Sequence, residues 1–172
     1  MRDIADAVGI GVSSLYNHYK SKDDLLAAFY SYFATQFTIT VPTHDELKSR
    51  AYTQSALEAL NALNYDYGPE IGPTLTKIIR VAAREARRDK KSNAFLEWYI
   101  NGCLKDPIEF TLKALMKQNK IKCVDIKTIS CIISNFAFAA NFLSESSIQM
   151  SAREWANSIE YLFKTVTLNG SD

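Results

Sequence analysis

The chain has 172 residues and a mass of 19.4 kDa, the size of one domain or of a small module joined to a larger one. Its 47% hydrophobic and 23% charged residues, with only 6 Gly and 4 Pro, are typical of a folded protein and exclude a disordered or collagen-like chain. Because the net charge is only +1, a nucleic acid, a membrane or an acidic substrate would have to be recognised by a local patch.

Three cysteines, Cys103, Cys123 and Cys131, form no C-x-x-C pair, which does not fit a disulfide framework or a thiolate zinc site. We therefore expect reduced thiols, no metal and no cofactor. The acidic start of the chain is unlike a signal peptide, and the longest uncharged stretch, residues 128–144, is too short and too polar to span a bilayer. These features predict a cytoplasmic protein with no membrane partner.

Residues 1–20 predict two short helices joined by a sharp turn. Apolar side chains recur at helical spacing on both sides of Gly9; they are Ile4, Ala5, Val8, Val12, Leu15 and Tyr19. Ala5 is small enough for the helices to cross closely, Gly9 can take the positive φ of the turn, and Leu15 fills the angle between the helices. This pattern is typical of a helix-turn-helix.

If the apolar residues of the second short helix point inward, its polar residues point outward, as in a helix that reads a DNA groove. The outward residues are Ser13, Ser14, Asn17 and His18. Asn17 can pair bidentately with adenine, and the serines allow close approach to base edges. From spacing alone, DNA recognition and ordinary packing of two short helices are equally favoured.

A longer helix is predicted over residues 22–37, because Ser21 and Asp24 have the spacing of a capping box. Its expected buried stripe is Leu25, Phe29, Phe33 and Phe37, widened by Leu26 and Tyr30. Half of this helix should be buried.

The string Arg2-Asp3-Ile4-Ala5, then Val8-Gly9-Ile10, then Leu15-Tyr16-Asn17-His18-Tyr19-Lys20-Ser21-Lys22-Asp23-Asp24-Leu25-Leu26, resembles the DNA-binding domain of the tetracycline-repressor (TetR) family. The resemblance implies that Arg2 and Ser14 face bases, that Tyr16 and His18 approach the backbone, and that Lys22 holds a phosphate. With the residues of the second helix, the predicted DNA-binding set is Arg2, Ser13, Ser14, Tyr16, Asn17, His18 and Lys22.

Members of that family carry a further helix that packs under this motif, so the resemblance implies that a helix is missing before Met1. Ile4, Val8, Leu15 and Leu26 would then lose cover, and leaving two such side chains half exposed costs about 1.5–3 kcal/mol. We expect a loosened N-terminal region and weakened DNA binding for the chain as it stands.

Beyond residue 40, helices are expected over residues 45–64 and 73–89, the second starting at Pro73. Residues 77–91 carry seven bases against two acids. A phosphate contact by this run is conceivable, but a solvated charged face is the favoured interpretation. A further helical region over residues 93–119 contains Asp106-Pro107, which predicts either a new helix start or a kink.

Two final helices are expected over residues 125–143 and 151–165, and the first is apolar on two sides. Together they predict a four-helix dimer interface, which we favour over a purely internal bundle. The residues expected there are Ile129, Ile133, Phe136, Ala140, Trp155, Ile159, Leu162 and Val166.

The resemblance also implies a pocket for a small effector between the helices of the second part. Its candidates are Phe95, Trp98, Tyr99, Cys103, Phe110, Asn135, Phe138 and Phe142, although core packing is the favoured role of each aromatic residue. Asn135 would need a partner if buried, and a ligand could supply one.

The sequence as a whole predicts an all-α protein, with a DNA-binding part and its connecting helix over residues 1–40 and a regulatory and dimerisation part over residues 41–172. It contains no Walker, H-E-x-x-H or nucleophile-elbow motif, which argues against an enzyme. We expect a ligand-responsive repressor that binds a palindromic operator as a homodimer. The alternative is a truncated helical dimer that senses a small molecule and does not bind DNA on its own.

Overall fold

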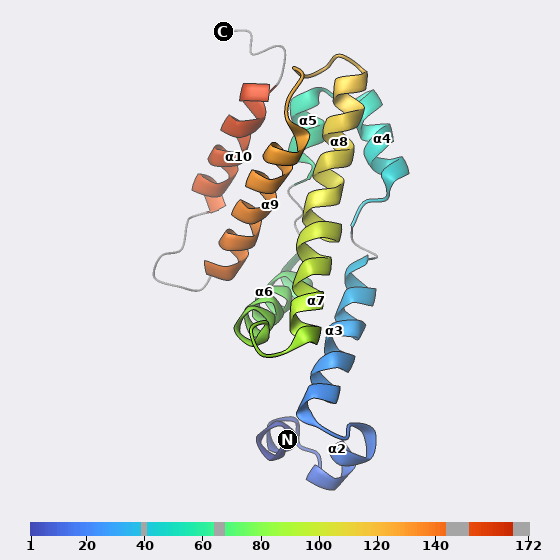
Figure 1. Cartoon of the computed structure of the whole chain (residues 1–172), viewed down its shortest axis with the longest axis vertical. Helices are drawn as coiled ribbons and strands as arrows, with labels where there is room; N and C mark the ends of the chain where they lie inside the picture. Colours follow the sequence, from blue (N-terminus) through green and yellow to red (C-terminus); the bar gives the residue numbers. More distant parts are fainter. Residues whose placement is uncertain (39–40, 64–67, 144–151, 167–172) are drawn as a thin grey trace.

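The computed structural model describes residues 1–38, 41–63, 68–143 and 152–166, and every regular element in these ranges is a helix. The predicted all-α class is therefore confirmed. The helices form an elongated molecule. The N-terminal pair of helices lies at the end of a connecting helix, apart from the larger bundle (Figure 1).

The N-terminal pair, which we call the head, consists of α1 (Arg2–Val8) and α2 (Val12–His18). The connecting helix α3 spans Lys22–Thr38, close to the predicted 22–37. Ser21 caps α3 as expected, because its Oγ accepts a hydrogen bond of 3.0 Å from the backbone N–H of Asp24.

The single helix expected over residues 45–64 is instead two helices, α4 (His44–Thr53) and α5 (Ala56–Asn61). The break occurs at Gln54, whose extended backbone precedes a second capping box. Ser55 Oγ accepts from the N–H of Glu58, and the Glu58 carboxylate accepts from the N–H of Ser55. A new helix therefore begins where continuation was expected.

Helix α6 spans Gly68–Glu85, so it begins five residues before the predicted start at Pro73. It is followed by α7 (Lys90–Trp98), the π-helical segment η1 (Tyr99–Lys105) and α8 (Asp106–Lys117). These last three form one long helix without a break in its helical backbone (Figure 1). Pro107 has no N–H to donate, and the wider π turn, in which Asp106 N–H bonds to Asn101 C=O, absorbs it.

The last two helices, α9 (Ile126–Leu143) and α10 (Ala152–Val166), lie close to the predicted ranges and form one side of the molecule (Figure 1). None of the helices in the described ranges is long and apolar enough to cross a membrane. Within the same ranges, no three His, Cys, Asp or Glu side chains gather as metal ligands would.

Two apolar clusters hold the bundle together. The lower core, nearer the head, joins α3 to α6, α7 and η1, and its buried members are Tyr30, Phe33, Leu75, Ile78, Ile79, Ala82, Phe95, Tyr99, Cys103 and Leu104. The upper core joins α4, α5, α8, α9 and α10, and its buried members are Ala51, Ala56, Ala59, Leu60, Ile108, Leu112, Leu115, Ile121, Ile133 and Phe163. The lower core is thus the one that fixes the connecting helix.

The buried face of α3 is narrower than the sequence predicted. Tyr30 and Phe33 are buried, whereas Phe29 remains 44% exposed, and the side chain of Phe37 lies outside the described residues. The contacts of α3 are mainly with α7, so the stripe expected from helical spacing overstates the buried part of α3.

Candidate nucleic-acid interface

The turn of the head is a glycine-dependent helix end. Gly9 has φ 72° and ψ 29°, in the left-handed region that its sequence position predicted. Its N–H bonds to Asp6 C=O at 3.3 Å, and the N–H of Ile10 bonds to Ala5 C=O at 3.0 Å. This is a Schellman motif, which ends α1 and turns the chain sharply into α2.

The packing between α1 and α2 also follows the sequence. Ala5 is completely buried and Leu15 is 6% exposed, so these two side chains form the inner contact of the head. Val12 and Tyr19 are half-buried at its margin. The polar residues of α2 consequently lie on the outer face of the helix.

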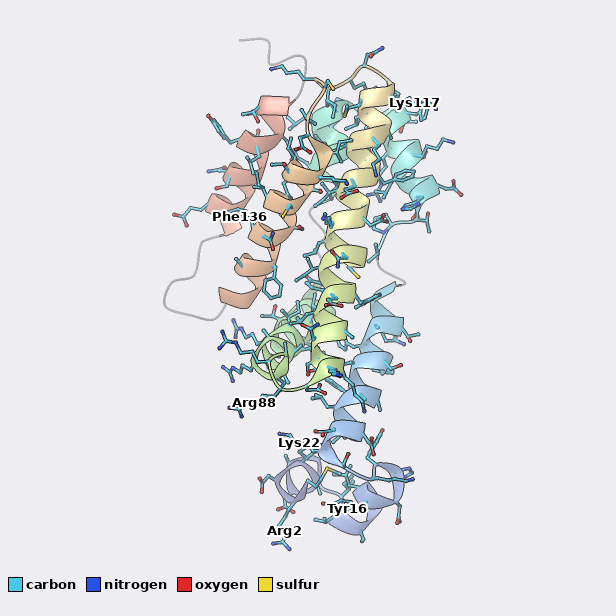
Figure 2. All side chains as sticks on the ribbon, in the orientation of Figure 1. Arg2, Tyr16, Lys22, Arg88, Lys117 and Phe136 are labelled. Atoms are coloured by element: carbon cyan, nitrogen blue, oxygen red, sulfur yellow. The ribbon has the colours of Figure 1, made fainter. Side chains whose placement is uncertain are left out.

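All seven predicted DNA-binding residues are exposed in the structure: Arg2, Ser13, Ser14, Tyr16, Asn17, His18 and Lys22. Arg2 and Tyr16 lie at the free end of the head, and Lys22 lies where the head joins α3 (Figure 2). Five of these residues belong to α2, which has only seven residues. The head therefore presents one contiguous polar helix with basic groups on its flanks.

Part of the apolar surface of the head is uncovered. Val8 is 62% exposed and Ile10 is 43% exposed. The expectation that Leu15 would lose cover is wrong, because Leu15 is buried against α1. Leu26 is half-buried and packs against the lower core, so it takes its cover from the bundle.

The head is linked to the bundle through a buried contact between α3 and α7. Tyr30 stacks on Phe95, with ring centroids 4.7 Å apart and planes inclined by 15°. The Tyr30 hydroxyl lies 3.0 Å from Ser92 Oγ, and Ser92 Oγ donates to the Asp89 carboxylate at 2.6 Å. Because the serine has one hydroxyl proton, Tyr30 is the donor to Ser92.

Burial raises the pKa of Tyr30, and the nearby carboxylates of Asp89 and Glu85 raise it too. The Ser92 hydroxyl and N–H lower the pKa of Asp89, which caps α7. The pair of hydrogen bonds that joins Tyr30 to Ser92 and Ser92 to Asp89 was not predicted from the sequence. The Asp89-x-x-Ser92 spacing indicates the α7 cap, but no local pattern indicates that Tyr30 lies against it.

The predicted effector residues lie in three regions. Phe95, Trp98, Tyr99, Cys103 and Phe138 all belong to or pack against the lower core. Phe110 stacks on His44, with centroids 4.1 Å apart, and Asn135 is exposed and donates to Cys131 C=O at 2.9 Å. The side chain of Phe142 lies outside the described residues.

A cavity of about 400 Å³, open to solvent, lies between α3 and α7. Its walls contain two of the predicted effector residues, Phe95 and Trp98, together with Tyr30 and several alanines. Lys91 lines it as well, and Lys91 Nζ is 3.8 Å from a carboxylate oxygen of Asp24. The cavity is therefore apolar with one cation.

The predicted dimer residues point partly into the subunit. Ile133 is buried in the upper core, and Ile129, Phe136 and Leu162 pack against that core. The side chains of Ala140, Trp155, Ile159 and Val166 lie outside the described residues. Among the side chains of α9 and α10 that the structure describes, the large apolar residues that are exposed are instead Ile132, at 50%, and Tyr161, at 71%. The three- and four-residue spacing on α9 correctly identified an apolar stripe, but this stripe packs against the upper core of the same subunit.

Comparisons with known proteins agree with this geometry. Residues 1–29 match the family described as "Bacterial regulatory proteins, tetR family". The whole fold is similar to the crystal structure of a TetR-family transcriptional regulator from Agrobacterium tumefaciens, with a TM-score of 0.70 and 16% sequence identity over 96% of this chain and 85% of that one. No curated protein matches the chain. The first 29 residues are therefore similar to the N-terminal part of that family, and the fold as a whole is similar to that of the Agrobacterium tumefaciens regulator.

Proposed function

We propose that this chain is a DNA-binding transcriptional repressor that binds an operator of two inverted half-sites as a homodimer and releases it when a small effector binds. The observation that carries the proposal is the outer face of α2. Ser13, Ser14, Tyr16, Asn17 and His18 are all exposed there, while buried Leu15 holds the helix against α1.

The side chains of this face match the chemistry of base and phosphate contacts. Asn17 has the donor and acceptor pair that fits adenine in the major groove, and Ser14 can donate or accept at a base edge. Tyr16, His18 and Lys22 would hold the DNA backbone, and Arg2 would reach a base from the start of α1.

Selection of DNA duplexes from a random-core pool tests this proposal. We expect enrichment of an inverted repeat whose half-sites lie about one helical turn, or about 34–36 Å, apart. The Ser14→Glu variant should enrich nothing, because it places a negative charge on the exposed face of α2 without altering a buried group. Absence of enrichment by the unaltered chain, or equal enrichment by both, would contradict the proposal.

The proposed dimer forms through α9 and α10. Ile132, Asn135 and Phe136 of α9 and Ser158, Tyr161 and Leu162 of α10 line an open, largely apolar hollow of about 780 Å³. A second copy would cover this apolar surface about a two-fold axis.

We expect Ile132→Glu and Tyr161→Glu to give monomers in light scattering. Val81→Glu is the control, because Val81 is 42% exposed on α6 and does not line this hollow. A dimer that survives both interface changes would place the dimer contact elsewhere.

The proposed effector site is the cavity between α3 and α7. A ligand there would touch both the connecting helix and the bundle, so it could favour one orientation of the head over another. Only a ligand with different affinities for the two orientations would release DNA. The apolar walls and Lys91 favour a small apolar or aromatic anion.

An aromatic sulfonate dye, anilinonaphthalene sulfonate, is a suitable probe for this cavity. We expect the dye to quench tryptophan emission in the unaltered chain and in Trp155→Phe, and to quench it much less in Trp98→Phe. Equal quenching in the two variants would place the dye elsewhere.

The rival function is a helical dimer that senses a small molecule without binding DNA on its own. The exposed Val8 and Ile10 favour it, because a head with uncovered apolar surface is less stable. In that case the duplex selection fails, while dimer formation and dye binding persist.

A further inference from the structure

The turn that joins α6 to α7 carries a dense cluster of cations, which we call the basic corner: Arg84, Arg87, Arg88, Lys90 and Lys91. Residues 84–91 hold these five bases against two acids, for a net charge of +3. Since the whole chain has a net charge of +1, the other residues together carry −2. The positive charge of the protein is thus concentrated at this corner.

The two acids of the corner do not neutralise its arginines. Asp89 caps α7, and its carboxylate accepts from Lys91 N–H at 3.3 Å, Ser92 N–H at 2.7 Å and Ser92 Oγ at 2.6 Å. Glu85 is half-buried, and within the described residues no ion pair joins its carboxylate to an arginine. Its backbone C=O accepts the N–H groups of Arg88 and Asp89 at 2.8 and 2.9 Å. The backbone of the corner is therefore well ordered, and its charges remain available.

The cations themselves face solvent. Arg84, Arg87, Arg88 and Lys90 are exposed, and within the described part of the chain no ion pair joins any of them to a carboxylate. Arginine presents a planar fork of donors that fits a phosphate group. A run of such side chains on one surface is the electrostatic footprint of a polyanion partner.

The structure places this surface beside the head. Lys91 Nζ lies 3.8 Å from an oxygen of Asp24, which is two residues after Lys22. Arg88 and Lys22 lie toward the same end of the molecule as Arg2 and Tyr16, whereas Lys117 lies at the opposite end (Figure 2). The sequence alone favoured a solvated charged face for residues 77–91. It could not show that the basic corner lies near the head in the folded chain.

We propose that the basic corner is a second DNA contact, outside the head, which binds backbone phosphates of the duplex that the head reads. This inference rests on the proposed DNA-binding function. Its contacts are with phosphates alone, so the corner adds affinity and salt dependence to binding without adding sequence preference.

The test compares the double variant Arg87→Ala/Arg88→Ala with Lys117→Ala/Lys122→Ala. Lys117 ends α8 and Lys122 lies in the segment between α8 and α9, at the end opposite the head (Figures 1 and 2). Each is titrated against a labelled selected duplex and a scrambled duplex, at salt concentrations of about 50–200 mM. Thermal unfolding of both variants checks that the fold is intact.

For the corner variant, the slope of log K against log salt should fall by about 0.9 for each phosphate that the protein no longer neutralises, or up to about 1.8 per subunit. Affinity for both duplexes should fall several-fold, and their ratio should stay unchanged. The far-end variant should keep the slope of the unaltered chain.

An unchanged slope in the corner variant would overturn this inference and leave the proposed function intact. An equal fall in the far-end variant would also overturn it, because the effect would then come from overall charge. If the unaltered chain binds neither duplex, the proposed function fails, and this inference fails with it.

Discussion

Tyr30 of α3 and Ser92 of α7 are 62 positions apart in sequence and share a buried hydrogen bond of 3.0 Å. This bond and the stacking of Tyr30 on Phe95 join the connecting helix to the first turns of α7. Any change in the angle of α3 must therefore strain a small, defined set of contacts.

Removal of the Tyr30 hydroxyl should weaken this junction without leaving a cavity. We expect Tyr30→Phe to lower the free energy of unfolding by about 0.5–1.5 kcal/mol, because one buried hydrogen bond is removed while the ring stack remains. Urea denaturation measures the change. Tyr32→Phe is the matched control, because Tyr32 lies on the same helix and is 63% exposed. Equal decreases in the two variants would show that the Tyr30 bond contributes nothing of its own.

The two glycines Gly9 and Gly102 should respond to alanine in opposite directions. Gly9 has φ 72°, so Gly9→Ala should destabilise the head by about 1–2 kcal/mol, although a Cβ there would meet nothing within 4 Å. Gly102 is helical, and a Cβ there would be 3.8 Å from Trp98, an ordinary contact. Gly102→Ala should therefore stabilise the bundle by about 0.5–1 kcal/mol.

Amide hydrogen exchange across residues 1–20 and across α7 to α8 separates these two effects. Faster exchange in the head of Gly9→Ala and slower exchange in the bundle of Gly102→Ala are expected. In the unaltered chain the head should also exchange faster than the bundle, because Val8 and Ile10 are exposed. Uniform protection of the unaltered chain would contradict the last expectation, and unchanged exchange in either variant would contradict the expectation for that glycine.

Stability should fall in acid because carboxylates cap several helices. Hydrogen bonds from Thr43, Ser55, Ser92 and Thr128 lower the pKa values of Glu46, Glu58, Asp89 and Asp125, respectively. A carboxylate whose pKa is lower in the folded state contributes stability above its unfolded pKa of about 4, and this contribution disappears as the pH falls through the folded pKa.

The capping carboxylates should therefore change the midpoint of urea unfolding little between about pH 7 and pH 5. Their protonation should lower this midpoint below about pH 4. Asp89→Asn should show a smaller decrease than the unaltered chain, because its cap no longer titrates. A decrease of the same size in Asp89→Asn would show that the Asp89 cap does not contribute.

The three cysteines should differ in reactivity. Burial raises the pKa of the Cys103 thiol to about 12, and only 3% of the residue is exposed, so it should stay unreactive in the folded chain. Cys123 and Cys131 are exposed. A thiol reagent should label two groups per chain before unfolding and a third after it. Rapid labelling of all three would mean that the lower core opens readily.

The sequence predicted those elements whose signals are local. Gly9 marked the turn, Ser21 marked the start of α3, and the outward positions of α2 followed from the inward positions of Val12 and Leu15. These features depend on residues within one or two helical turns, so periodicity and capping rules are enough to locate them.

The errors have two origins. The break at Gln54 has a local signal, because Ser55 and Glu58 have the spacing of a capping box, and that signal was missed. The other features depend on distant contacts: the end of α4 is stabilised by Lys120, whose Nζ donates to the C=O groups of Ala51, Tyr52 and Gln54 at 2.8, 3.1 and 2.7 Å. The inward turn of Ile133 and the exposure of Phe29 likewise depend on which neighbour each helix meets. Helical spacing finds a stripe, but it does not identify the partner of that stripe.

Loss of discrimination in an Asn17→Ala variant is the most direct test of the claim that the outer face of α2 reads DNA. Competition binding compares a duplex selected by the unaltered chain with the same duplex altered at one base pair of each half-site in turn. We predict that Asn17→Ala loses about 1–3 kcal/mol of discrimination at one A·T position and keeps it at the others. Unchanged discrimination at every position would contradict this claim.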